Sequence, residues 1–202
     1  MFRRSEKVLD IVEVGDPVLR KVARRLSPEE ITAEATASLV RAMRTTMRRA
    51  PGVGLAAPQV GRGIALAVVE DTEELVSRTD SALVRLQERR VVPFQVLINP
   101  ELEVDDEEEV EFYEGCLSLG NFRMLVRRHR SVWVRAADEN GEVREIHATG
   151  WHARILQHEI DHLNGVLCID RMTGRSLTTL ANYTKHWSHL TSEEVRQALR
   201  AR

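Results

Sequence analysis

Two histidines four residues apart, His158 and His162, constrain the fold of this chain more than any other feature of its sequence. Positions four apart lie on the same face of an α-helix, so both imidazoles can bind one metal ion there. Glu159 lies beside them as a candidate acid/base, and Asn164-Gly165 is typical of a helix end. The alternative is a helix with two surface histidines and a solvated acid. The pattern therefore predicts a helix that ends here, with a metal site as its functional interpretation.

A hydrolytic metal centre usually has three protein ligands and one open position, so a third ligand must come from elsewhere in the chain. The candidates are the two cysteines, Cys116 and Cys168. Cys116 lies next to glycine, where the backbone can approach a metal closely. Cys168 lies in the apolar run Val166–Ile169, which predicts a buried strand, but it also holds the place of the third histidine in HExxHxxGxxH proteases. Local context favours Cys116 and leaves Cys168 open, and a disulfide between them is not expected without signs of secretion.

A glycine-rich segment, GVGLAAPQVG at residues 52–61, matches neither the dinucleotide fingerprint nor the P-loop. Its small residues let the backbone approach a ligand, and the amide of Gln59 can stabilise a developing oxyanion. The alternative is an ordinary turn punctuated by Pro58 and the glycines. By itself the segment favours the turn.

Three segments in this order resemble the motif set of the peptide deformylase family. They are GVGLAAPQVG at 52–61, EGCLS at 114–118 and QHEIDHLNG at 157–165. The resemblance extends over nearly the whole chain, from Val14–Arg20 onward, and no position that carries chemistry departs from it. The longer stretch Glu70–Pro93 and the segment Gly150–Arg154 are similar to the type 1 subgroup that includes organellar enzymes.

The resemblance implies a hydrolase that removes the N-formyl group from the formylmethionine of nascent polypeptides. It implies one divalent metal per chain, Fe²⁺ first and Zn²⁺ or other divalent ions as alternatives, whose bound water attacks the formyl carbon. Glu159 would be the general acid/base, and Gln59 and the Leu117 N–H would stabilise the oxyanion. The implied metal ligands are Cys116, His158 and His162.

The resemblance also implies roles around this centre. The backbone of Gly54 would pair with the substrate peptide, and Glu114 and Arg123 would form a pair that holds the metal loop.

An apolar pocket beside the metal is a further prediction. Trp151 and Ile155 share a helix face with the two histidines, so they can hold a methionine side chain or simply belong to the core. Val53 and Phe112 could complete such a pocket.

The order of elements predicts an α+β fold. The resemblance implies that antiparallel sheets pack around a central metal-binding HExxH helix. Further helices are predicted at Pro28–Ala50, capped by Ser27, and at about 191–202, opened by a capping box. The predicted strands are Ile64–Val69, Val96–Ile98, Ser131–Ala137 and Val143–Ala148.

Length and charge limit the remaining possibilities. The 202 residues predict a single catalytic domain, and a net charge of −2 gives no case for DNA binding. No apolar run reaches the length of a membrane span, and Met1–Lys7 has no apolar signal region. We therefore expect a bacterial cytoplasmic protein, with a mature organellar form as the alternative.

Basic residues suggest one further partner. The runs Arg41–Arg49 and Arg123–Arg130, with Arg196, Arg200 and Arg202, are either surface charge or a contact with ribosomal RNA.

Two other functions stay open at this point. One is a metalloendopeptidase that uses Cys168 as its third ligand. The other is an inactive relative that binds the ribosome, which the intact residues of the three motifs disfavour.

Overall fold

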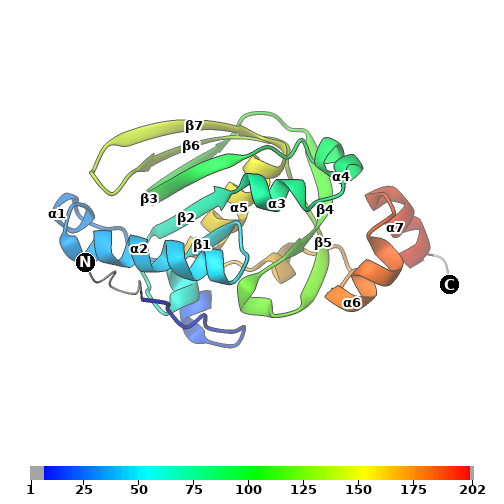
Figure 1. The fold of residues 1–202 in the computed structure, drawn as a ribbon, viewed down its shortest axis with the longest axis horizontal. Helices are drawn as coiled ribbons and strands as arrows, with labels where there is room; N and C mark the ends of the chain where they lie inside the picture. The colour runs from blue at the N-terminus through cyan, green and yellow to red at the C-terminus, as the bar shows by residue number, and fades with distance from the viewer. Residues whose placement is uncertain (1–6, 201–202) are drawn as a thin grey trace.

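The computed structural model describes residues 7–200. Within this range the strands form a five-stranded sheet in the order β1-β2-β3-β6-β7 and a three-stranded sheet in the order β4-β5-β8, and all pairs are antiparallel (Figure 1). The strands are β1 (Gly54–Ala56), β2 (Leu66–Asp71), β3 (Val92–Val104), β4 (Glu109–Gly115), β5 (Phe122–His129), β6 (Ser131–Ala137), β7 (Val143–Thr149) and β8 (Thr178–Thr179).

The helices are distributed around these sheets, and α5 packs against strands of both (Figure 1). The α-helices are α1 (Pro28–Ile31), α2 (Glu34–Arg49), α3 (Glu73–Ser77), α4 (Ser81–Leu86), α5 (Gly150–Leu163), α6 (Leu180–Asn182) and α7 (Ser192–Arg200). Short 3-10 helices are η1 (Pro17–Arg20), η2 (Ala57–Val60), η3 (Leu117–Leu119) and η4 (Cys168–Arg171), and η5 (Tyr183–Trp187) is a π-helix.

Helix α5 buries its apolar face in the main core. Leu156, Ile160 and Leu163 pack there against alternating residues of the five-stranded sheet. The helix ends at Leu163 with Asn164 as its C-cap, and Gly165 follows with a φ of +72°. This left-handed conformation suits glycine, so the predicted helix end is confirmed.

The first helix is shorter than predicted. Ser27 and Glu30 form a capping box that opens α1, but the chain is extended at Ala33 before α2 begins. The hydroxyl of Thr36 donates to the Glu30 carbonyl at 2.6 Å, which helps to fix the break. The predicted continuous helix over Pro28–Ala50 is therefore wrong.

The predicted strand at Val166–Ile169 is also wrong, because Cys168 begins a 3-10 turn. The Asp170 carboxylate accepts a hydrogen bond from the Leu167 N–H at 2.8 Å and so holds this turn. The stretch Glu70–Pro93, in which no helix was predicted, contains α3 and α4, with Thr72 and Asp80 as their N-caps.

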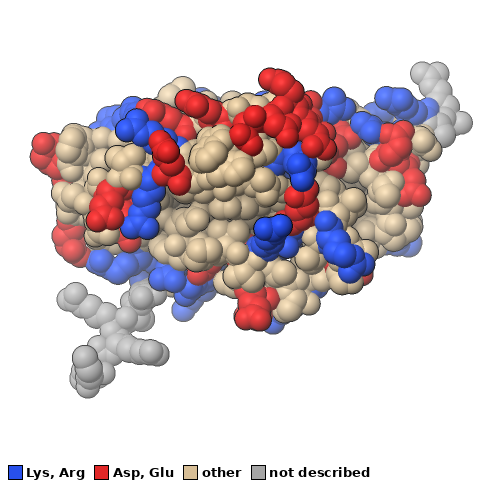
Figure 2. Space-filling view, turned by 90° about the horizontal axis from the view of Figure 1, so that it is seen from above, with Lys and Arg blue, Asp and Glu red and all other residues tan. Residues whose placement is uncertain are grey.

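Among residues 7–200, no helix is both long enough and apolar enough to cross a bilayer. Acidic and basic side chains are interspersed over the face seen in Figure 2. The run at Arg123–Arg130 is not a basic patch, because Arg128 is buried and Arg130 pairs with Glu88 at 2.7 Å. Arg202 lies outside the described residues.

Candidate metal and catalytic site

A cleft of about 710 Å³ opens between the two sheets. Strands β1 and β4 each stand at the end of their sheet within residues 7–200, and residues of both line the cleft. Most of the predicted site residues line it as well. They are Val53, Gly54, Gln59, Glu114, Cys116, Leu117, Arg123, Trp151, Ile155, His158 and Glu159.

Sulfur and imidazole donors converge at the floor of this cleft. The Sγ of Cys116 lies 3.3 Å from the Nε2 of His162, and the rings of His158 and His162 have centroids 5.0 Å apart. The ligand atoms of Cys116, His158 and Cys168 lie within 4.8 Å of one another. Cys116 is thus next to both histidines of the predicted motif, and the second cysteine is adjacent.

The environment of these donors favours a thiolate. A hydrogen bond from Cys168, followed by those from His158 and His162, holds the pKa of Cys116 well below that of an ordinary thiol despite its burial. The same interaction raises the pKa of the Cys168 thiol, together with its burial. The two thiols therefore differ, and Cys116 is the one whose surroundings favour the thiolate form that metals bind.

Glu114 orients one of the histidines. Its Oε2 lies 2.9 Å from the Nδ1 of His158, which leaves Nε2 for another partner. Arg128 and Arg154 each place a guanidinium nitrogen 2.6 Å from Oε1 of Glu114, and all three side chains are buried. Burial alone would raise the pKa of Glu114, but Arg128, His158 and Arg154 hold it well below its usual value.

The predicted pairing of Glu114 with Arg123 is wrong, for a reason given by strand register. In β4 and β5, Glu114 stands opposite Met124, and Gly115 stands opposite Arg123. Successive side chains alternate between the faces of a sheet, so Arg128 shares the face of Glu114 and Arg123 lies on the other. The Arg123 guanidinium lies against Gly115 instead.

Glu159 stands close to the backbone of the glycine-rich segment. A Cβ at Gly54 would lie 2.6 Å from the Cδ of Glu159, so glycine is required for this approach. The Oε2 of Glu159 has no hydrogen-bond partner among the described residues, and burial raises the pKa of this carboxyl to about 7. A carboxyl with this pKa can both accept and donate a proton near neutrality.

The side-chain amide of Gln59 points toward Cys116. Its Oε1 accepts from the Ala56 N–H at 2.9 Å, which turns Nε2 toward the Sγ of Cys116 at 3.5 Å. Leu117 begins η3 directly after Cys116. Both groups predicted to stabilise an oxyanion are therefore neighbours of Cys116.

Residues 8–177 match the family model of polypeptide deformylase. The chain belongs to the polypeptide deformylase family. It is 42% identical over 180 residues to peptide deformylase 1A, chloroplastic, of Solanum lycopersicum. The alignment covers 89% of this chain and 65% of that protein. The chain is 42% identical over 191 residues to peptide deformylase 1 of Streptomyces coelicolor, which covers 95% and 85%. The chain thus spans just under two thirds of the length of the tomato protein.

Solved structures of this family share the fold. A peptide deformylase from Synechococcus elongatus in complex with actinonin aligns with a TM-score of 0.70 and 38% identity, over 87% of both chains. A Met-Ala-Ser-bound class I type b peptide deformylase from Acinetobacter baumannii aligns with a TM-score of 0.73 and 32% identity, over 83% of this chain and 99% of that one. The predicted mixed fold with antiparallel sheets is confirmed.

Not every predicted residue reaches the cleft of this deformylase-family chain. The ring of Phe112 lies 5.2 Å from the Arg154 guanidinium and is not among the lining residues. His162 is only 1% exposed and is not among the residues that line the cleft.

Two groups of residues that line the cleft lie outside the three sequence motifs and were not predicted as site residues. One comes from the stretch that contains α3 and α4, and the other follows β8. They are Thr79, Leu83, Gln87 and Arg89, and Leu180 and Tyr183.

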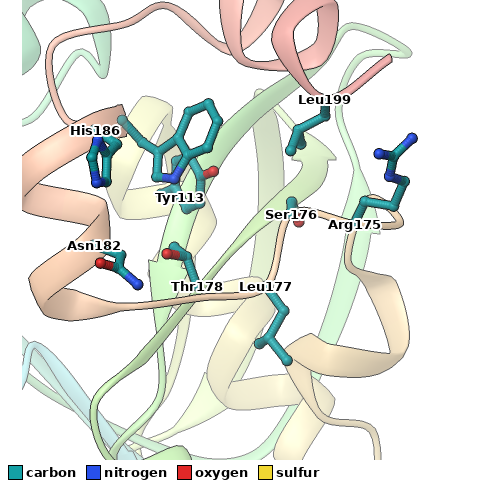
Figure 3. A pocket seen from close by; sticks show the side chains of 9 residues that line it. Tyr113, Arg175, Ser176, Leu177, Thr178, Asn182, His186 and Leu199 are labelled. Atoms are coloured by element: carbon teal, nitrogen blue, oxygen red, sulfur yellow. The ribbon is translucent and has the colours of Figure 1, made fainter. Parts of the chain in front are cut away.

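A second cavity of about 310 Å³ lies among the C-terminal elements (Figure 3). Tyr113 lines both this cavity and the cleft. The lining of the second cavity contains neither a carboxylate nor a cysteine. Among the described residues, the candidate metal ligands Cys116 and His158 line the cleft instead.

Proposed function

We propose that this chain is a metal-dependent peptide deformylase that removes the formyl group from the N-terminal formylmethionine of nascent polypeptides. The observation that carries the proposal is the convergence of Cys116, His158, His162 and an unpartnered Glu159 carboxyl at the floor of a cleft between two sheet edges. Membership of the deformylase family supports it.

The donor set fits a divalent metal. Ligand atoms around a tetrahedral ion at zinc–ligand distances lie about 3.6 Å apart, close to the 3.3 Å between Cys116 Sγ and His162 Nε2. The carboxylate of Glu114 on the far nitrogen of His158 is the usual partner of a metal-binding histidine. Cys116, His158 and His162 would hold Fe²⁺, or Zn²⁺ or another divalent ion, since one thiolate and two imidazoles suit several of these metals. When bound, this metal supplies Lewis acidity and lowers the pKa of a coordinated water.

The surrounding groups can carry the proton and the developing charge. Glu159 would accept the proton of the attacking water and deliver it to the leaving amine, as its pKa of about 7 allows. The amide of Gln59 and the N–H of Leu117 would donate hydrogen bonds to the oxyanion that forms on the formyl oxygen.

The two edge strands suit an extended peptide. An edge strand offers unpaired N–H and C=O groups, so a substrate can add as a strand along β1 and β4, with Gly54 as one backbone partner. Trp151 and Ile155 on α5, with Val53, would surround the methionine side chain. These three also pack against the main core, so pocket wall and core are the same residues here.

The test is formate release from formyl-Met-Ala-Ser by protein purified without oxygen and loaded with Fe²⁺. We expect turnover that stops on chelation and returns with metal. Glu159→Ala should retain stoichiometric metal and lose turnover. Full activity of that variant would show that the base is assigned wrongly.

A metalloendopeptidase remains the competing function, because Cys168 lies beside the donors. It requires Cys168→Ser to abolish metal binding and Cys116→Ser to spare it. Deformylation requires the reverse.

We also propose that the basic residues contact ribosomal RNA. Several arginines on which this contact depends are paired with carboxylates, among them Arg130 with Glu88 and Arg196 with Glu111. Salt-sensitive co-sedimentation with ribosomes would support the contact, and its absence at low salt would refute it. We also propose a bacterial cytoplasmic location, with a mature organellar form as the alternative, since the relatives include a bacterial protein and a chloroplastic one.

A further inference from the structure

The C-terminal segment Thr178–Trp187 forms part of the cleft wall, although the family match ends at residue 177. Leu180 and Tyr183 line the same cleft as Cys116 and Glu159. This part of the wall therefore belongs to a segment outside the matched region.

Strand pairing fixes Leu180 near the turn that follows Cys116. Thr179 stands opposite Phe122 in the β5–β8 pair, and the Leu180 N–H donates to the Asn121 carbonyl at 2.6 Å. Asn121 follows η3, the turn that begins directly after Cys116. Leu180 is 38% exposed, which leaves apolar surface free for contact.

Aromatic packing fixes Tyr183. Its ring lies 4.8 Å from the ring of Tyr113, between centroids, with the planes at 52°. The following helix α7 is anchored by the fully buried Val195 and by an ion pair of 3.3 Å between Arg196 and Glu111. Leu180 and Tyr183 are thus held at both ends of their segment.

The pleat of β4 assigns this wall to one substrate position. Glu114 points toward α5, where it contacts His158, so Tyr113 points to the opposite face, where Tyr183 covers it. Side chains of a peptide added along β4 alternate in the same way. If the first side chain points toward α5, the second points toward the face of Tyr113 and Tyr183.

We propose that Leu180 and Tyr183 are specificity-determining residues that contact the side chain of the residue following formylmethionine and favour an apolar one there. The inference rests on the proposed deformylase function. It predicts selectivity at the second position and little at the third, because the third side chain points back toward the α5 face.

The test compares kcat/KM of the Fe²⁺-loaded protein for three peptides, formyl-Met-Leu-Ser, formyl-Met-Ser-Leu and formyl-Met-Ser-Ser. We expect kcat/KM for formyl-Met-Leu-Ser to exceed that for formyl-Met-Ser-Ser by roughly tenfold, as partial burial of one leucine side chain allows. The value for formyl-Met-Ser-Leu should be close to that for formyl-Met-Ser-Ser. In Leu180→Ser and in Tyr183→Ala the leucine preference should fall to about twofold or threefold. Tyr183→Phe should restore the wild-type preference, since it retains the ring.

Leu177→Ser is the matched control. Leu177 is 48% exposed in the same region of the chain, but it lines the second cavity and not the cleft (Figure 3). It should leave all three values unchanged. Equal preference in wild type and Leu180→Ser, or a uniform loss on all peptides, would overturn the inference. A wild-type protein that releases formate from none of the peptides would refute the proposed function, and this inference with it.

Discussion

Gly54 is the residue at which the backbone passes close to Glu159, the proposed acid/base. A Cβ at this position would overlap the carboxyl group of Glu159, the flexible end of a side chain rather than a fixed backbone atom. An added methyl group should therefore move the carboxyl instead of unfolding the strand. Displacement of a catalytic group by about 1 Å can cost roughly a hundredfold in rate.

We expect Gly54→Ala to lower kcat/KM by about 100-fold or more while melting temperature and metal content stay close to wild type. Formate release, calorimetry and metal analysis measure the three quantities. Gly63→Ala is the control, because a Cβ there meets nothing within 4 Å. Normal activity in Gly54→Ala would mean that Glu159 has no fixed position in the reaction.

Replacement of Glu114 should affect the stability of the protein. Glu114 is the shared partner of the buried Arg128 and Arg154, and removing one member of a buried ion pair costs about 3–5 kcal/mol. Glu114→Gln should lower the free energy of unfolding in urea by this amount. Glu109→Gln is the control and should change it by less than about 1 kcal/mol, because its partner Arg127 is half exposed and 3.9 Å away.

At the scale of elements, the start of α5 depends on Gly150. Its φ is +58°, and a Cβ would lie 2.6 Å from the carbonyl oxygen of Gln87. Both the conformation and the contact disfavour a side chain, so Gly150→Ala should destabilise the protein by about 2–4 kcal/mol. Calorimetry should show a lower melting temperature, whereas Gly174→Ala, with open space around its Cβ, should melt like wild type. Equal melting of the two variants would contradict this account.

Elements were predictable where a local pattern determines them. The alternation in Ser131–Ala137 gave β6 with its observed bounds, and the Asn164-Gly165 signal gave the end of α5. The apolar run at Val166–Ile169 misled, since the Asp170 carboxylate stabilises a turn there. Apolar character alone does not separate a buried strand from a buried turn.

Site residues were likewise predictable where a short motif contains them and not where long-range pairing places them. The motifs contained Cys116, His158 and Glu159, but the correct partner of Glu114 depends on strand register, which no short motif records. Leu180 and Tyr183 reach the cleft only through long-range pairing with β5 and β4. The prediction of a single catalytic domain over residues 1–202 stays a prediction.

At the scale of the whole molecule, the donors come from two parts of the fold. Cys116 follows the edge strand of the smaller sheet, and His158 and His162 lie on the helix that packs against both sheets. A metal bound by all three would connect these parts, and the unfolded chain offers no such arrangement. Metal binding should therefore stabilise the native state specifically.

We expect chelation to lower the melting temperature by about 5–10 °C. A ligand at a hundredfold its Kd adds about 2.7 kcal/mol to the free energy of unfolding, and for a protein of this size each kcal/mol shifts the melting temperature by about 2–4 °C. Scanning calorimetry with and without Zn²⁺ measures the shift without any need for turnover. Cys116→Ser and His162→Ala should lose it, whereas Glu159→Ala and Cys168→Ser should retain it. Since Cys168 lies in the same cluster of ligand atoms, this contrast decides between the two thiols. A shift retained by Cys116→Ser and lost by Cys168→Ser would make Cys168 the third ligand and favour the endopeptidase.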